Sequence, residues 1–135
     1  MNQQTILLLQ ESWKKVELIA TQAAELFYQN LFAADPSLRA LFKGDMNVQG
    51  KKLMQMIGLA MNNLNHPETL VPALQSLAKR HIGYGVQESH YAAVGAALLK
   101  TLGQGLGEDF TPSVKDAWTD AYRFMADTMI AATKS

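Results

Sequence analysis

The amino-acid sequence predicts an all-α protein. Two strong helix formers dominate it, since Ala and Leu each occur 18 times among the 135 residues. Apolar residues recur every three to four positions in one segment after another, which is the period of an amphipathic helix. No stretch alternates apolar and polar residues for long enough to indicate a β-strand, and the β-branched residues are dispersed. Helices are therefore the expected elements along the whole chain.

Three helices are predicted in the first half of the chain, each from an apolar stripe along one helix face. Between the second and the third, Asp35-Pro36 places a capping side chain before a proline whose fixed φ suits a first helical turn. The stripes are Ile6, Leu9, Trp13 and Val16; then Ala20, Ala23, Ala24, Phe27 and Leu31; then Leu53, Met56, Ile57, Ala60 and Leu64.

Three more helices are predicted in the second half. Asn65-His66-Pro67 ends the third helix, Gly83 and Gly85 end the fourth, and Thr111-Pro112 begins the last. The stripes are Leu70, Leu74, Leu77 and Ala78, which mark a shorter helix; Tyr91, Val94, Leu98 and Leu102; and Val114, Ala117, Trp118, Ala121, Met125 and Met129.

The glycine-rich segment 103–107 (GQGLG) is similar to a phosphate-binding loop at first sight. It follows a predicted helix rather than a strand, and it lacks the lysine and the hydroxyl residue that end such a loop. We therefore expect an interhelical turn here.

Length and composition exclude several functional classes. A chain of 135 residues predicts one domain, over residues 1–135. The formal net charge is zero, so the charge balance indicates neither nucleic acid nor a membrane surface as a partner. The sequence has no cysteine, which excludes disulfides, thiolate zinc sites and thiol catalysis within it.

The N-terminal segment MNQQTILLLQESWKK lacks the charged-then-apolar order of a signal peptide. No window approaches the roughly 18 apolar residues of a membrane span. We therefore expect a cytoplasmic protein with no membrane segment, and the sequence favours a monomer or a weak homodimer.

Three polar residues are placed unusually. His81 lies one turn after Leu77 on the apolar face of a helix that then stops, whereas His66 and His90 are expected at the surface. Tyr28 lies on the second apolar stripe, and Gln49 begins the third. A buried phenol, amide or imidazole needs a hydrogen-bond partner, so each could simply be a satisfied core residue. The alternative is that all three converge on one site.

Several motifs resemble those of bacterial globins. The string FYQNLF of residues 27–32, followed by Asp35-Pro36 and Leu41-Phe42, is similar to their second helix and the corner after it. Residues 77–86 (LAKRHIGYGV), followed by His90-Tyr91 and Val94-Gly95, resemble their haem-binding helix and the start of the next. The tail from Phe110-Thr111-Pro112 through Ala117-Trp118 to Tyr122 is similar to the last helix of bacterial and neuroglobin-like globins.

This resemblance covers the chain in order and without a large insertion. It implies a globin fold of six to eight helices in a three-over-three arrangement, enclosing one haem b. His81 would be the proximal ligand and would leave the sixth iron position open. Its other ring nitrogen would donate to the carbonyl of Leu77. Phe42 would pack against the porphyrin, and Lys52 and Arg80 would lie near the propionates, although these two could equally be solvated surface charges. The walls of the pocket would be formed by Leu53, Leu77, Val86, Tyr91 and Val94.

Tyr28 and Gln49 match the distal residues of these globins, so the resemblance implies binding of O2 and of other small gases such as NO, CO or sulfide. Bound O2 becomes superoxide-like, and a hydrogen bond to a charged acceptor is worth roughly 1.5–3 kcal/mol. Tight O2 binding with slow release follows. In neuroglobin-like proteins a distal histidine closes the sixth iron position; Gln49 is a poor ligand for this purpose, and Lys52 is the alternative sixth ligand when no gas is bound.

Two other functions remain open. One is NO dioxygenase activity with a separate reductase as partner, and the other is a haem-based sensor module acting through a protein partner. In flavohaemoglobins, a glutamate late in the last helix polarises the proximal histidine together with the counterpart of Tyr91. The matching position here is about Thr133, which weakens the expectation of NO dioxygenase chemistry.

Overall fold

The computed structural model describes residues 2–83 and 85–134, and within these ranges it contains helices and no strand. The predicted all-α class is therefore confirmed. No described helix is long and apolar enough to cross a membrane. The elements are α1 (Gln3–Glu17), α2 (Ala20–Ala34), the 3-10 helix η1 (Pro36–Leu41), α3 (Met46–Asn62), α4 (Pro67–Gly83), α5 (His90–Leu106), the 3-10 helix η2 (Gly107–Asp109) and α6 (Pro112–Thr133).

Local side-chain bonds begin several of these helices. The Asp35 carboxylate accepts from the backbone N–H of Ser37 at 3.1 Å and begins η1. The Thr111 hydroxyl accepts from the backbone N–H of Val114 at 3.3 Å and begins α6. In both cases the next residue is a proline in the first turn, as the sequence predicts. Asp45 caps α3 in the same way, by accepting from the backbone N–H of Asn47 at 2.8 Å.

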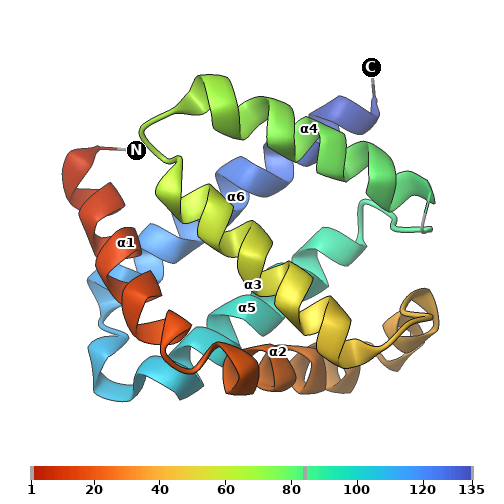
Figure 1. Cartoon of the computed structure of the whole chain (residues 1–135), viewed down its shortest axis with the longest axis horizontal. Helices are drawn as coiled ribbons and strands as arrows, with labels where there is room; N and C mark the ends of the chain where they lie inside the picture. Colours follow the sequence, from red (N-terminus) through yellow and green to blue (C-terminus); the bar gives the residue numbers. More distant parts are fainter. Residues whose placement is uncertain (1, 84, 135) are drawn as a thin grey trace.

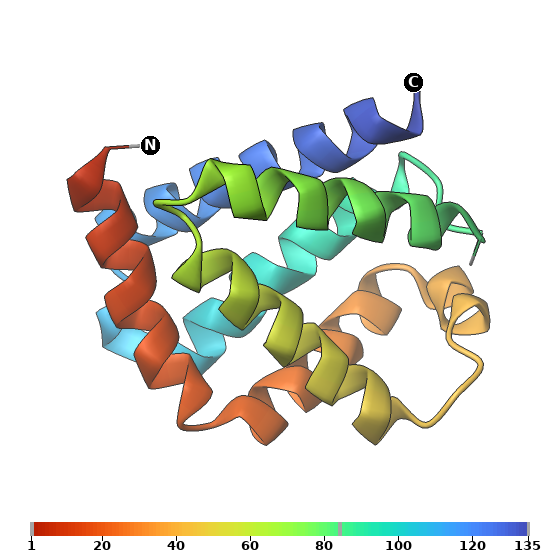
Figure 2. The same ribbon diagram turned by 45° about the horizontal axis from the view of Figure 1, so that its top comes forward.

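The helices pack around one apolar core. α2 packs against α5 and α3, whereas α4 packs against α6 and α1 packs against α6 and α3 (Figure 1). In Figure 2, α4 and α6 lie side by side along the top of the molecule, with α3 and α5 crossing below them. The largest fully buried side chains are Trp118, Leu9, Leu31, Met61, Leu70, Leu74 and Leu102.

Two elements differ from the prediction. The fourth helix is not short, because α4 spans 17 residues and continues through Pro72. α4 begins at Pro67, a residue type suited to the first turn of a helix, and it contains Pro72 five residues later. The GQGLG segment is not a turn, because α5 continues to Leu106 and only Gly107, with φ +57°, leaves the helix. Gly103 and Gly105 leave room for Phe110 and Ile19, whose side chains lie 3.4 and 3.3 Å from where a Cβ would stand.

Two further glycines allow close helix crossings. A Cβ on Gly50 of α3 would lie 3.0 Å from the Cβ of Ala24 on α2. A Cβ on Gly95 of α5 would lie 2.6 Å from the ring of Tyr122 on α6. Because real Cβ atoms essentially never come that close, Gly95 sets the distance between these two helices.

Candidate functional site

The predicted site residues lie on elements that meet at one end of the molecule. The C-terminal end of α4, the helix η1 and the N-terminal end of α3 all lie at the right-hand side of Figure 1. At this end the turn after α4 contacts η1, because a Cβ on Gly85 would lie 3.5 Å from Cδ2 of Leu41. Gly85 has φ +87°, a conformation that side chains other than glycine rarely adopt. Gly85 therefore allows the chain to turn from α4 toward α5 beside η1.

Tyr28 and Gln49 come together on one wall of this region. Tyr28 is 9% exposed, and its hydroxyl donates to the backbone carbonyl of Gln49 at 3.4 Å. That length is near the limit for a hydrogen bond, so the bond is weak and easily exchanged for a better acceptor. Burial raises the pKa of Tyr28 to about 12, so the phenol remains protonated at neutral pH and can donate.

An aromatic cluster surrounds Tyr28. The rings of Tyr28 and Phe42 meet edge to face with centroids 5.3 Å apart, and Phe32 stacks on Tyr28 at 5.8 Å. The Arg39 guanidinium lies 5.5 Å from the centroid of Phe32 and donates to the carbonyl of Phe42 at 3.4 Å. These contacts fix the corner after α2 and position Phe42 beside Tyr28. Neither Phe32 nor Arg39 was predicted from the sequence as a site residue, although Phe32 is part of the FYQNLF string.

His81 lies in the last turn of α4, half-buried, where the backbone N–H of Val86 donates to its carbonyl at 3.0 Å. Burial lowers the pKa of the His81 imidazole below its ordinary value, and the charge of the neighbouring Arg80 lowers it further. The neutral imidazole is therefore favoured, which is the form that binds a metal.

The predicted pocket-wall residues are neither fully buried nor fully exposed. All five are partly buried, and all except Val86 pack against the apolar core. Phe42 has the same partial burial. Partial burial is expected of apolar residues that line a cleft and are covered when it is filled. The five are Leu53, Leu77, Val86, Tyr91 and Val94.

Lys52 and Arg80, the predicted partners of the propionates, both have exposed side chains. They belong to the N-terminal half of α3 and the last turn of α4.

Tyr122 is a residue of this region that sequence reasoning did not assign to the site. Its hydroxyl donates to the backbone carbonyl of Tyr91 at 2.6 Å, and its ring fills the space that Gly95 leaves open. α6 thereby holds the first turn of α5, which carries the predicted wall residues Tyr91 and Val94. The absence of a side chain at Gly95, one turn after Tyr91, was the signal that could have indicated this contact.

The other two histidines have local roles. His66 is exposed, and its Nδ1 lies 3.3 Å from the Glu68 carboxylate. His90 is half-buried rather than fully at the surface, because its Nδ1 accepts from the backbone N–H of Gln87 at 3.0 Å at the start of α5. In the described part of the chain, no group of three or more His, Asp or Glu residues could hold a metal ion.

Two open grooves lie away from the predicted cleft. One of about 450 Å³ lies between α1 and α3 and is lined by Trp13, Met54 and Gly58. The other, of about 620 Å³, lies between the start of α4 and α6 and is lined by Leu70, Asp120 and Phe124. Neither groove is lined by a predicted site residue.

The residues present fit a haem in their chemistry. His81 supplies one neutral nitrogen donor, Phe42 and the wall residues supply partly buried apolar surface, and Tyr28 supplies a protonated hydroxyl that is only weakly held. Lys52 and Arg80 supply exposed positive charges.

Known proteins identify the family of this chain. Residues 25–129 match the family model described as Globin. The flavohemoprotein of Rhodopirellula baltica is 30% identical over 133 residues, covering 96% of this chain and 33% of that protein. The flavohemoprotein of Vibrio cholerae is 28% identical over 133 residues, with 96% and 34% covered. The chain therefore spans about a third of the length of the curated relatives it matches.

Solved structures share the fold. The structure of a bacterial globin from Campylobacter jejuni has a TM-score of 0.85 and 24% identity, and covers 98% of this chain and 96% of that one. A hexacoordinated heme protein from an anhydrobiotic tardigrade has a TM-score of 0.91 at 15% identity, covering 100% and 96%. The fold, the single imidazole at the end of α4 and the family match together show that this chain belongs to the globin family, whose cofactor is haem b.

Proposed function

We propose that this globin binds O2 reversibly on a haem held by His81, with Tyr28 and Gln49 as hydrogen-bond donors to the bound gas. The contacts of Tyr28 with the Gln49 backbone and the Phe42 ring support the proposal, because they bring a protonated phenol together with two other predicted site residues. NO, CO and sulfide are further ligands that fit such a site.

A haem would supply an iron atom able to bind a small gas. His81 would hold the cofactor from α4, and its other ring nitrogen would donate to the carbonyl of Leu77. Apolar side chains would exclude water from the cofactor; they are Phe42, Leu53, Leu77, Val86, Tyr91 and Val94. Lys52 and Arg80 would pair with its carboxylates.

Tyr28 must exchange its hydrogen bond to act on the gas. In this structure its hydroxyl donates to the Gln49 carbonyl over 3.4 Å. A partly negative oxygen is a better acceptor than a helix carbonyl, because hydrogen bonds to charged acceptors are about twice as strong as neutral ones. Rotation of the Tyr28 hydroxyl toward the gas is therefore favourable with O2 and less so with CO.

Stopped-flow dissociation kinetics test the distal role. Tyr28→Phe should speed O2 dissociation roughly tenfold to a hundredfold, as expected for the loss of 1.5–3 kcal/mol, and change CO dissociation much less. Phe32→Leu serves as the matched control, because it alters the same aromatic cluster without removing a donor. Equal effects of Tyr28→Phe on both gases would exclude the role proposed for Tyr28.

Optical spectra of the ferric, ferrous and O2-bound forms test the proximal role. His81→Gly should lose haem or alter its spectrum, and added imidazole should restore the original spectrum. An unaltered spectrum without imidazole would contradict the assignment of His81.

NO dioxygenase activity with a separate reductase is the second candidate function, favoured by the identity to flavohemoproteins. Thr133 weighs against it, since this residue is not a carboxylate and its hydroxyl donates to the Ile130 carbonyl at 2.7 Å. Steady-state NO consumption in the presence of a generic reductase distinguishes the two functions. A cytoplasmic location agrees with either.

A further inference from the structure

Positive charge is concentrated around the predicted haem cleft. Residues 36–83, which form η1, α3 and α4, contain six Lys or Arg and two Asp or Glu. The other 87 residues contain six Lys or Arg and ten Asp or Glu. The zero net charge of the chain therefore combines a part of net positive charge with a part whose net negative charge has the same magnitude.

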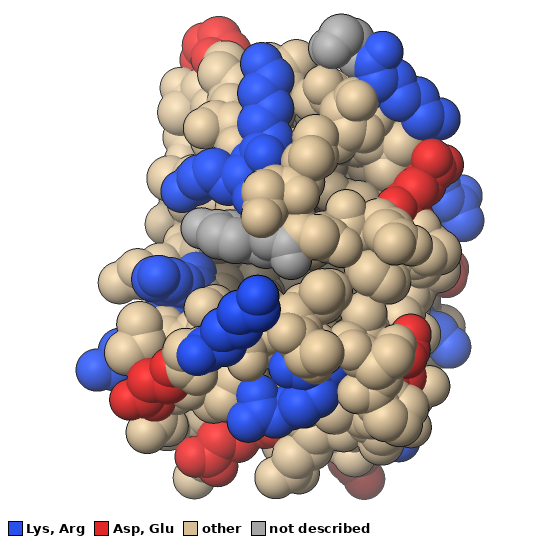
Figure 3. All heavy atoms as spheres, turned by 90° about the vertical axis from the view of Figure 1, so that its right-hand side faces the viewer, with Lys and Arg blue, Asp and Glu red and all other residues tan. Residues whose placement is uncertain are grey.

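We call the end of the molecule formed by η1, the N-terminal part of α3 and the C-terminal part of α4 the basic face. Figure 3 views this end and shows Lys and Arg side chains through its middle, with Asp and Glu nearer its edges. None of its six cations forms an ion pair with a carboxylate within the described ranges, and all six are exposed. They are Arg39, Lys43, Lys51, Lys52, Lys79 and Arg80.

The propionates of a haem account for only part of this charge. Two carboxylates can pair with Lys52 and Arg80, which leaves Arg39, Lys43, Lys51 and Lys79 without that role. Arg39 is engaged with Phe32 and Phe42. The remaining three lysines have exposed side chains and no such contact among the described residues, so they are available to an anionic partner.

The same helix ends also expose apolar side chains. Val48 in the first turn of α3 is 48% exposed, and Ile82 in the last turn of α4 is 52% exposed. Other exposed large apolar residues, such as Leu7 and Leu18, lie on or directly after α1, so the exposure of Val48 and Ile82 does not by itself indicate a partner. Together with the lysines they offer apolar contact area beside a polar rim, an arrangement found in protein–protein interfaces.

We propose that the basic face docks an acidic electron-carrier protein, which delivers single electrons to the haem. The proposal rests on the proposed function, because O2 binds only to ferrous iron. Iron that has become ferric must gain one electron, and the carrier loses that electron. The basic face includes Lys52 and Arg80, the proposed partners of the haem carboxylates, so a carrier bound there would lie close to the haem. The segregated charges also steer such a partner, because the negative part of the chain repels it.

Binding of oxidised flavodoxin, an acidic one-electron carrier, tests this directly. The haem-loaded protein is compared with the variant Lys43→Glu/Lys51→Glu/Lys79→Glu by calorimetry at low and high ionic strength. Lys52 and Arg80 are left unchanged, because they belong to the proposed haem site. The matched control is Lys14→Glu/Lys100→Glu/Lys115→Glu, which makes the same charge change at exposed lysines of α1, α5 and α6.

The face variant should bind flavodoxin at least ~10-fold more weakly than the original protein, and the control variant within about 2-fold of it. The affinity of the original protein should fall as salt is added. As a second pair, Val48→Asp should weaken binding several-fold, whereas Leu18→Asp, at an 85% exposed residue after α1, should not. The rate at which reduced flavodoxin reduces the ferric protein should likewise fall in the face variant and in Val48→Asp, and change little in the two controls.

Three results would overturn the proposal. One is no measurable binding of flavodoxin by the original protein at low salt, and another is equal weakening in the face and control variants. The third is that the protein binds anionic phospholipid vesicles but not flavodoxin, and that only the face variant loses the vesicle binding. This result would assign the basic face to a membrane surface. O2 dissociation is measured in every variant, so that failure of gas binding is distinguished from failure of docking.

Discussion

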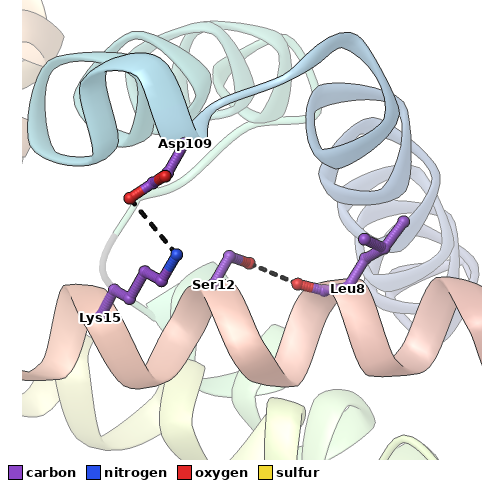
Figure 4. Close-up of polar contacts among 4 residues, drawn as sticks. All are labelled: Leu8, Ser12, Lys15 and Asp109. Atoms are coloured by element: carbon purple, nitrogen blue, oxygen red, sulfur yellow. Dashed lines mark hydrogen bonds and ion pairs between the residues drawn. The ribbon is translucent and has the colours of Figure 1, made fainter.

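At the scale of single residues, Ser12 connects the first and last helices. Its hydroxyl donates to the carbonyl of Leu8 at 2.7 Å (Figure 4), and it accepts from the indole N–H of Trp118 at 2.9 Å. The neighbouring Trp13 differs, because its buried indole N–H has no acceptor among the described residues. The two tryptophans lie 6.3 Å apart in one core, so they form a matched pair.

We expect Trp118→Phe to lower the free energy of unfolding by about 1 kcal/mol more than Trp13→Phe does. Both changes remove similar volume from the core, but only the first breaks a buried hydrogen bond and leaves Ser12 without its donor. Urea denaturation of the two haem-loaded variants measures the difference. An equal loss in both would mean that the bond between Trp118 and Ser12 adds nothing to stability.

Tyr28 gives a prediction about pH. Its pKa, raised by burial from 10.0 to about 12, means that folding favours the protonated phenol. The stabilisation is fully present below pH 10, where the unfolded chain also keeps this proton, and is lost as the pH rises to about 12. The O2 dissociation rate should therefore be constant from pH 7 to pH 10.

Absorbance at 295 nm, which reports tyrosinate, provides the second measurement. The difference between the original protein and Tyr28→Phe should show a tyrosine that ionises well above pH 10. A midpoint near pH 10 would mean that Tyr28 is solvated and not held in the distal wall.

The sequence could indicate Tyr28 and Gln49 because polar residues on an apolar stripe are conspicuous. It could not indicate that the Tyr28 hydroxyl meets the backbone of Gln49 rather than its side chain. Nor could it pair Ser12 with Trp118, which lies 106 positions away, because that contact exists only after α1 and α6 have packed.

At the scale of elements, the crossing of α5 and α6 depends on Gly95. The Tyr122 ring lies against it, and that ring is held by its hydroxyl bond to the Tyr91 carbonyl at 2.6 Å. Burial raises the pKa of Tyr122 well above its ordinary value, so this donor remains protonated. A larger residue at position 95 would have to displace the ring and break the bond.

We therefore expect Gly95→Ala to destabilise the protein by about 2 kcal/mol or more. The control is Gly58→Ala, whose Cβ would lie in ordinary contact, 3.5 Å from the Trp13 indole, and which should gain about 0.5–1 kcal/mol of helix propensity. Thermal unfolding followed by circular dichroism measures both variants. If Gly95→Ala proved as stable as Gly58→Ala, the two helices would be free to separate.

The apolar stripes predicted the six α-helices, because each helix buries one face. They underestimated the length of two of them. α4 spans 17 residues and continues through Pro72, although proline usually disrupts a helix interior. Gly103 and Gly105 look like turn residues, but their missing side chains make room for Phe110 and Ile19.

At the scale of the whole molecule, the core and the proposed haem site differ in burial. Trp118 in the core is fully buried, whereas Phe42 after η1 and His81 at the end of α4 are half-buried. Bound haem would cover these residues and stabilise the folded state by mass action.

Removal of the haem should therefore raise hydrogen exchange most in residues 36–45 and in the last turn of α4. Amides of α6 around Trp118 should change far less, because that helix is fixed by core packing. Hydrogen-exchange mass spectrometry of the haem-free and haem-loaded protein makes the comparison. A uniform increase along the chain would indicate that core and cleft unfold as one unit.

The separation of charge described for the basic face also affects how the protein behaves on ion exchangers. A chain with an isoelectric point near 6.8 would ordinarily pass both resins at neutral pH. Because an adsorbing surface meets one side of a molecule at a time, we expect this chain to be retained at low salt by sulfonate and by quaternary-ammonium resins alike. Replacing Lys43, Lys51 and Lys79 with glutamate should abolish retention by the sulfonate resin alone.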